Sequence, residues 1–364
     1  MRARGLALLG PVAQGLERRT HNLLVLGSNP SGPTGAGDEP LPREGALTVS
    51  LTDVERARAV VASHITRTPL LTSRSLGERI GARAFLKAEN LQRTGSFKPR
   101  GAVNAILGLT AAQRANGIVT MSAGNAAQAI AYAGRAVGAK VTVAMPQSAP
   151  KTKVEATRGY GAEIVFAADM LGLRALVKEI QERQGSYFLH PFDDDGMIAG
   201  HGTCALEVLD DLPEADLFVV GVGGGGLISG IAVAVAAKRP GARVIGVEPT
   251  GADAVRRALD TGSPVPMERV QTVADGLAAP IAGVRNLELI KHHVADVVLI
   301  SDEVILEGVR FLAARARLVA EPAGAAAVGA LLSGAVKPRS GENVVAIVSG
   351  GNVDLSRLAE FFQA

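Results

Sequence analysis

The sequence predicts an α/β protein of two lobes, each built on a parallel sheet flanked by helices. Over residues 117–195, short apolar strands alternate with helical segments, which is typical of β-α units in one compact lobe. Two further apolar strands, 217–222 and 344–348, run into glycine-rich turns. With 364 residues, 47% of them hydrophobic, the chain is long enough to bury a core in each lobe.

The composition restricts the classes of partner. Lys and Arg total 38 against 35 Asp and Glu, and 3% of the residues are aromatic, so no nucleic-acid surface is expected. The single cysteine, Cys204, excludes an internal disulfide framework and suits a reducing cytoplasm. We therefore expect a cytoplasmic protein that acts on a small molecule, with no role at a membrane.

Residues 1–48 differ from the rest of the chain, because they are rich in Gly and Pro and show no sustained apolar period. We expect this segment to be disordered. A signal or transit peptide is the alternative, but no small-residue cleavage site follows the short apolar run 1–9. Back-translation of the segment also resembles a transfer RNA gene, so a further hypothesis is that translation begins near Val49.

The first helix is expected over residues 51–64, where apolar residues recur at helical spacing, with Thr52 or Asp53 as its cap. Thr68-Pro69-Leu70 should then form an extended turn. A strand at 84–89 follows and leads into the next loop.

This loop carries Lys98, which is flanked by Gly95, Ser96, Phe97 and Pro99. Such a junction between a strand and a helix usually lies at the surface of a binding cleft. An amine that an aromatic ring partly shields can have its pKa lowered enough to react with an aldehyde. The alternative is an ordinary solvated lysine on a loop.

A second junction follows the strand at 117–121 and reads Ser122-Ala123-Gly124-Asn125-Ala126-Ala127-Gln128 before an Ala-rich helix. Backbone N–H groups and a hydroxyl at a helix N-terminus form an anion site. The loop is therefore a candidate clamp for a substrate carboxylate, with the Asn125 amide bonding a second oxygen. Ordinary capping of the helix by Ser122 or Asn125 is the alternative.

The third junction contains four successive glycines, Gly223 to Gly226, after the strand at 217–222. Without Cβ atoms, their amides can turn inward around a phosphate. A dinucleotide site is a serious alternative, since Gly221, Gly223 and Gly226 also satisfy G-x-G-x-x-G and Glu248 follows where a ribose-binding acid belongs.

The last junction places Ser349 at the end of the strand 344–348, before Gly350-Gly351-Asn352. A hydroxyl at the carboxyl end of a parallel strand points into the crevice where α/β proteins bind ligands. Ser349 is thus a candidate partner for a ring nitrogen. A plain serine in a glycine-rich turn is the alternative.

Together these four motifs resemble the fold-type II pyridoxal-phosphate (PLP) enzymes, specifically the threonine dehydratase and serine racemase group, over residues 51–364. The resemblance implies a tryptophan synthase β-like fold. It also implies a large PLP-binding domain of residues 49–116 and 196–364 and a small substrate-clamping domain of residues 117–195. The dinucleotide alternative leaves Lys98 and Ser349 without roles.

The resemblance also implies roles for single residues. Lys98 would hold PLP as a Schiff base and take the Cα proton, Phe97 would lie against the ring, Asn125 would bond the ring hydroxyl, and Ser349 would bond the pyridine nitrogen. The phosphate would be cradled by Gly223, Gly224, Gly225 and Gly226. The substrate would be bound by Ser122, Ala123, Gly124 and Gln128.

The sequence departs from the family pattern at several positions. Ala126 stands where the family commonly has His. His201, which we expect to be a packing residue in a helix that begins at Gly200, stands where the family has Gln. Ala123 replaces the second serine of the racemase loop, which favours elimination over racemisation. Glu248 is matched by Ala254 where metal-binding relatives have an aspartate, so no metal is expected.

The resemblance therefore implies a lyase that converts L-threonine and L-serine to 2-oxobutanoate or pyruvate and ammonia, as a homodimer. Another enzyme of the same fold, such as a 3-hydroxyaspartate lyase or serine racemase, is the first alternative. A catalytically idle ligand-binding protein and an NAD-dependent dehydrogenase are the others.

Overall fold

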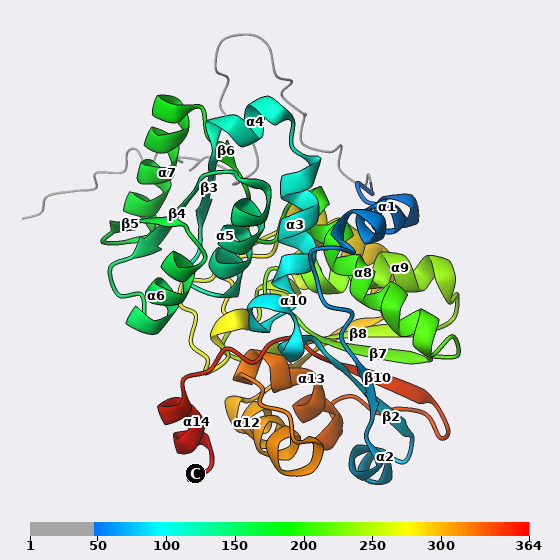
Figure 1. Ribbon diagram of the computed structural model, residues 1–364. Coiled ribbons are helices and arrows are strands. Elements are labelled where there is room, and N and C mark those ends of the chain that lie inside the picture. Colours follow the sequence, from blue (N-terminus) through cyan, green and yellow to red (C-terminus); the bar gives the residue numbers. More distant parts are fainter. Residues whose placement is uncertain (1–46, 364) are drawn as a thin grey trace, which may run out of the picture.

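The computed structural model describes residues 47–363, which form two sheets with helices packed against them (Figure 1). The predicted α/β fold of two lobes is confirmed. The segment predicted to be disordered, residues 1–48, lies outside the described residues except for its last two. Of these, Thr48 donates a hydrogen bond from Oγ1 to Asp195 Oδ1 at 2.7 Å, and the next residue, Val49, is buried.

The larger sheet has the strand order β1-β2-β10-β7-β8-β9. Its strands run parallel except for β1, which pairs with β2 in the antiparallel sense. Their bounds are β1 Leu70–Thr72, β2 Arg83–Ala88, β7 Leu217–Gly221, β8 Arg243–Pro249, β9 Asp296–Ile300 and β10 Asn343–Val348.

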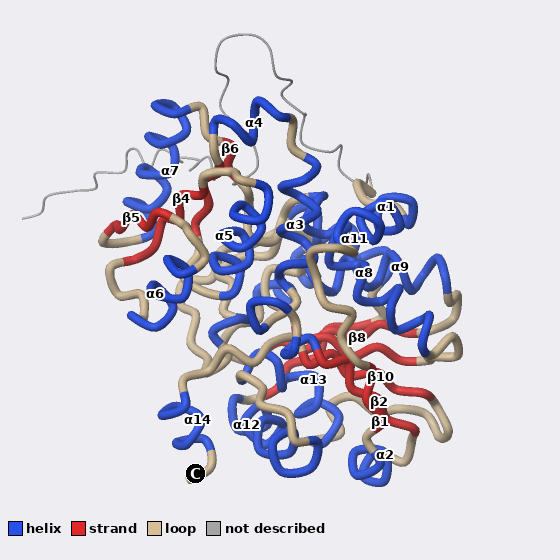
Figure 2. The backbone as a smooth tube through the Cα atoms, in the orientation of Figure 1, coloured by secondary structure: helices blue, strands red, loops and turns tan. Residues whose placement is uncertain are grey.

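Helices cover both faces of the larger sheet (Figure 2). Alternate residues of β7 divide between the faces: Phe218 and Val220 join one hydrophobic core with α8 and α9, while Leu217 and Val219 join the other with α12 and α13. The helices of this lobe are α1 Leu51–Val61, α2 Arg74–Ile80, α3 Lys98–Gly108, α8 Asp195–Asp211, α9 Gly226–Lys238, α10 Ala254–Thr261, α11 Val284–His293, α12 Asp302–Phe311, α13 Pro322–Leu332 and α14 Leu355–Phe361.

The smaller sheet is parallel throughout and has the order β5-β4-β3-β6. Ile118 and Val143 face a core with α5, whereas Val119 and Ala144 face α7. The elements of this lobe are β3 Ile118–Met121, β4 Val141–Pro146, β5 Glu163–Ala167, β6 Tyr187–Phe188, α4 Ala111–Asn116, α5 Asn125–Val137, α6 Lys151–Gly159 and α7 Met170–Gln184.

Two helix boundaries differ from the sequence prediction. The cap of α1 is Ser50 rather than Thr52 or Asp53, because Ser50 and Asp53 bond each other's backbone in a capping box. The helix expected to begin at Gly200 instead begins at Asp195, where the Asp194 side chain accepts a hydrogen bond from Met197 N and caps it.

The order of the larger sheet positions the candidate site. β2, β10 and β7 are neighbours and run parallel, so the loops after their carboxyl ends meet at one edge. These are the loops that carry Lys98, Ser349 and the four glycines. Three motifs that are far apart in the sequence are thereby brought to one place.

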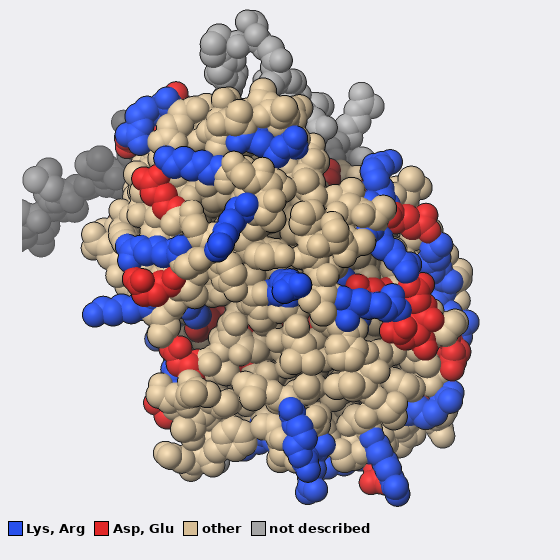
Figure 3. Space-filling view, viewed as in Figure 1, with Lys and Arg blue, Asp and Glu red and all other residues tan. Residues whose placement is uncertain are grey.

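The surface shown in Figure 3 carries basic and acidic side chains interspersed with each other. Among the described residues, each helix is too short or too polar to span a bilayer.

Candidate active site

The loop that carries Lys98 is fixed to the loop that follows β10. Phe97 N donates to Ser349 O at 3.0 Å, and Gly351 N donates to Gly95 O at 2.9 Å. The side chain of Asn352 donates from Nδ2 to Thr94 O at 2.7 Å. Ser349 and Lys98 are therefore held side by side by backbone contacts.

Lys98 is the first residue of α3, and its side chain is half-buried. Its Nζ donates to Pro191 O at 3.0 Å and lies 5.1 Å from the centroid of the Phe97 ring. Burial lowers the pKa of Lys98 to about 8. A lowered pKa increases the unprotonated fraction of an amine near neutral pH, which attack on an aldehyde requires.

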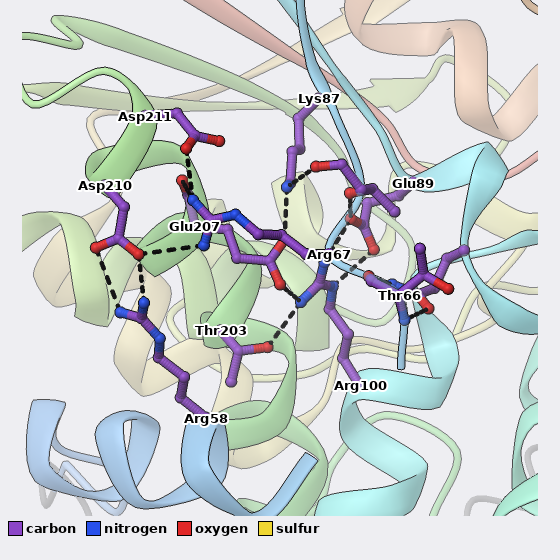
Figure 4. Close-up of polar contacts among 12 residues, drawn as sticks. Arg58, Thr66, Arg67, Lys87, Glu89, Arg100, Thr203, Glu207, Asp210 and Asp211 are labelled. Atoms are coloured by element: carbon purple, nitrogen blue, oxygen red, sulfur yellow. Dashed lines mark hydrogen bonds and ion pairs between the residues drawn. The ribbon is translucent and has the colours of Figure 1, made fainter. Parts of the chain in front are cut away.

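The start of α3 is anchored by a buried charge network that the sequence analysis missed (Figure 4). Arg100 is fully buried and binds Glu89 through Nε at 2.7 Å and Nη2 at 2.8 Å. It binds Glu207 on α8 through Nη1 at 2.8 Å and Nη2 at 2.7 Å. Lys87 on β2 also donates to Glu207, at 2.6 Å. The network ties β2, α3 and α8 together two residues beyond Lys98.

The Ser122–Gln128 loop opens α5 without a side-chain cap. Ser122 Oγ accepts a hydrogen bond from Gly124 N at 3.3 Å instead, so the capping alternative does not hold. Asn125 donates from Nδ2 to Glu321 Oε1 at 2.6 Å and accepts at Oδ1 from Asn352 Nδ2 at 2.8 Å. The helix N-terminus keeps the character of an anion site.

The glycine loop requires glycine at two positions. Gly225 has φ +101°, a conformation that residues with a Cβ rarely adopt, and a Cβ at Gly224 would collide with the ring of Phe192. Gly226 begins α9, so the loop presents backbone amides at a helix N-terminus.

One segment that the sequence analysis missed contacts both the lysine and the glycine loop. It comprises residues 190–193, between β6 and α8. Pro191 O accepts from Lys98, and Phe192 packs against Gly224. His190 Nδ1 accepts from Asp193 N at 2.8 Å, and burial together with the charges of Lys98 and Arg285 lowers the pKa of His190 to about 3.

Glu321 is a second functional candidate that the sequence did not reveal as such. It lies at the start of α13 and is buried, and burial raises its pKa to about 7 although the Asn125 hydrogen bond opposes the shift. Together with Gln128, Lys153 and Asp275 it lines a cavity of about 320 Å³. A larger surface hollow, of about 560 Å³ beside β1 and α2, lies away from these loops.

Ser349 and His201 differ in their surroundings. Ser349 is buried, and its Oγ makes only a long contact of 3.4 Å with Ala323 O, so its hydroxyl remains able to serve a ligand. The ring of His201, on α8, lies edge-on to Phe97 with centroids 4.8 Å apart. Burial, followed by the charge of Lys98, lowers the pKa of His201 far below its usual value, so the ring is neutral.

Glu248 has a structural role that removes it from the dinucleotide alternative. Its Oε1 and Oε2 accept hydrogen bonds from Val255 N and Arg256 N, both at 2.8 Å, at the start of α10. Burial raises its pKa to about 8. Both carboxylate oxygens are thus engaged by backbone within the chain.

The residues at this edge fit PLP. A half-buried amine of lowered pKa at Lys98, a glycine loop with backbone amides at the start of α9, and a weakly bonded buried hydroxyl at Ser349 suit the aldehyde, phosphate and ring nitrogen of that cofactor.

Comparison with known proteins agrees with a PLP site. Residues 61–350 match the family model of pyridoxal-phosphate-dependent enzymes. A catabolic L-threonine dehydratase of Staphylococcus aureus is 40% identical over 315 residues, 85% of this chain and 91% of that protein. An L-threonine ammonia-lyase of Thermotoga maritima is 40% identical over 312 residues, 85% of this chain and 77% of that protein. The structure of maize serine racemase aligns with a TM-score of 0.83 at 34% identity, covering 86% of this chain and 97% of that one. The chain belongs to the family of pyridoxal-phosphate-dependent enzymes.

Proposed function

We propose that this protein is an ammonia-lyase that converts L-threonine to 2-oxobutanoate and L-serine to pyruvate, with release of ammonia. The observation that carries the proposal is the amine of Lys98, whose lowered pKa and position beside Ser349 suit proton removal at a cofactor-bound substrate. Two relatives with 40% identity that are named for this activity support the choice of substrate.

Lys98 has two assigned roles in this reaction. PLP, when bound, withdraws electrons from the substrate Cα–H bond and makes that proton acidic. We assign covalent attachment of PLP to Lys98 Nζ, and removal of the Cα proton to the same amine once the substrate has displaced it. A pKa of about 8 leaves part of the Lys98 population unprotonated near neutral pH.

The remaining cofactor contacts follow the geometry of the loops. We assign the phosphate to the amides of Gly223 to Gly226, the ring nitrogen to Ser349, the ring hydroxyl to Asn125 and the ring face to Phe97. A neutral hydroxyl at the ring nitrogen holds a proton there less firmly than a carboxylate, which favours prompt elimination.

The substrate is assigned to the loop at the start of α5. We assign its carboxylate to the backbone amides of the Ser122–Gln128 segment, and Gln128 also lines the cavity of about 320 Å³. The substrate loses the Cα proton and the β-hydroxyl as water, and the resulting enamine hydrolyses to the 2-oxo acid and ammonia.

A serine racemase is the second candidate, because maize serine racemase is a structural neighbour. Ala123 argues against it. A racemase needs a proton donor on the face opposite Lys98, and the methyl group of Ala123 cannot supply one.

The test is incubation of the purified, PLP-loaded protein with L-threonine, L-serine and 3-hydroxyaspartate, followed by 2-oxo acid detection and chiral analysis. We expect 2-oxobutanoate from L-threonine. Oxo acid from 3-hydroxyaspartate alone would establish the alternative lyase, and no turnover with bound PLP would establish a ligand-binding protein.

The domain limits, assembly and location are also proposals. We propose a small domain of residues 117–195, supported by the four-stranded sheet whose strands all fall within it, and a large domain of 49–116 with 196–364. We propose a homodimer, which the resemblance to the threonine dehydratase and serine racemase group implies. The buried single cysteine fits a cytoplasmic location.

A further inference from the structure

Asn286, on α11, anchors the loop of Gly223 to Gly226 through a side-chain hydrogen bond. It lies in the first turn of α11 and is fully buried. Its Nδ2 donates to Gly224 O at 3.1 Å and to Phe192 O at 3.1 Å. Gly283 N donates to the same Gly224 oxygen at 3.0 Å. The carbonyl of the central glycine peptide is therefore fixed toward α11 by two donors.

A fixed carbonyl also fixes the amide that follows it. Because the peptide unit is planar and trans, the Gly225 N–H points to the side opposite the Gly224 carbonyl. That direction leads away from α11, to the side of the loop where the phosphate is assigned. Gly225 has no Cβ to interfere, and a Cβ there would lie 2.8 Å from Asn286 Cβ.

The position calls for a side-chain amide. Two carbonyl oxygens from different segments need two N–H donors at one point, which Asn supplies and which Ser, Thr and Asp do not. Asp193 holds the backbone of the same turn, since it accepts from Val284 N at 3.0 Å and from Asn286 N at 3.3 Å. Asn286 is therefore itself held in place.

We propose that Asn286 is a positioning residue for phosphate binding: it orients the peptide groups of Gly223 to Gly226 toward the cofactor phosphate. This inference rests on the proposed role of that loop. Asn286 does not touch the reacting atoms, so the expected effect of its loss is weaker binding of the phosphate.

The test compares Asn286→Ala with a matched control, Asn343→Ala. Asn343 is also buried, also donates from Nδ2 to a backbone carbonyl, Glu214 O at 2.9 Å, and also has an unpartnered Oδ1 among the described residues. It begins β10, at the end of the strand remote from Ser349. Asn286→Ala loses two side-chain hydrogen bonds and Asn343→Ala loses one, at different places in the fold.

Apoenzyme of each variant is titrated with PLP, with pyridoxal, which lacks the phosphate, and with inorganic phosphate as competitor. Loss of buried hydrogen bonds should weaken PLP and phosphate binding by Asn286→Ala about 10- to 100-fold. Pyridoxal should keep its parent affinity, and Asn343→Ala should bind PLP as the parent does. Parent PLP affinity in Asn286→Ala, equal weakening of PLP and pyridoxal, or equal weakening in Asn343→Ala would overturn the inference.

Two more variants keep the test decisive. If Asn286→Ala does not fold, Asn286→Ser retains one donor and should show an intermediate loss of PLP affinity; unchanged affinity refutes the inference. Gly225→Ala strains the loop directly. If Gly225→Ala binds PLP weakly and the Asn286 variant binds it as the parent does, the role of Asn286 is refuted but the phosphate loop is not. If Gly225→Ala and the Asn286 variant both keep the parent affinity, the assignment of the phosphate loop itself is refuted.

Discussion

Arg100→Ala should destabilise the folded protein strongly, because it removes the centre of the buried charge network (Figure 4). Arg100 and Lys87 together balance the charges of Glu89 and Glu207. Without Arg100, Lys87 faces two buried carboxylates alone. Removing one partner of a buried ion pair costs about 3–5 kcal/mol, since the other partner stays buried without its counter-charge.

A matched control is Arg74→Ala on α2. Arg74 pairs with Glu78 at 2.8 Å, but the two side chains are 90% and 62% exposed. An exposed pair of this spacing contributes about 0.3–0.5 kcal/mol. Equilibrium urea unfolding followed by far-UV circular dichroism measures both variants, because the chain has no tryptophan for fluorescence. A loss below about 1 kcal/mol in Arg100→Ala would contradict the assigned role of the network.

The pH dependence gives an independent check with a defined sign. Burial alone would raise the pKa of Glu89, but the charge and hydrogen bonds of Arg100 lower it below the usual 4.5. A lowered pKa gives stability above the unfolded value that is lost only as pH falls through the folded value. In Arg100→Ala, Lys87 and Thr68 still lower the pKa of Glu89, but burial, which is its largest perturbation, should now raise that pKa, so we expect this variant to lose stability as pH rises. The difference in unfolding free energy should grow from about pH 5 to pH 7; a constant difference would contradict the argument.

Three further predictions concern the active site. Lys98→Ala should abolish borohydride fixation of PLP, measured by mass spectrometry, and lower turnover at least 10²- to 10⁴-fold; labelling at another lysine would refute its role. Ser349→Asp should slow elimination in a stopped-flow assay, because the carboxylate favours the protonated ring nitrogen; an unchanged rate would place Ser349 elsewhere. Ala123→Ser should form more D-serine by chiral chromatography than the parent, and abundant D-serine from the parent would contradict the preference for elimination.

The sequence predicted the motifs of this site because each motif has a local signal. Apolar strands that end in glycine-rich turns mark the loops at Lys98, at Ser349 and at Gly223 to Gly226. The order of the strands has no local signal. That β10 lies between β2 and β7 depends on pairing between distant segments, and the residues alone did not predict it.

Other features were missed for different reasons. The cap of α1 could have been predicted, since Ser50-x-x-Asp53 is a capping-box pattern. The sequence analysis instead placed the cap two or three residues too late, at Thr52 or Asp53. Pro191, Phe192 and Asn286 carried no signal, because their roles arise from contacts with Lys98 and Gly224, which are remote from them in the chain. Phe192 and Asn286 matter because they lie against glycines, which have no Cβ. The sequence alone does not show which residues lie against those glycines.

The hydrogen bonds of Asn125 link the smaller lobe to the larger one. One N–H of its amide donates to Glu321 and its oxygen accepts from Asn352, so one N–H remains for the ring hydroxyl assigned to it. Asn352 in turn donates to Thr94 O in the lysine loop. The loop to which we assign the substrate carboxylate is therefore linked through Asn125 and Asn352 to the loop that carries Lys98.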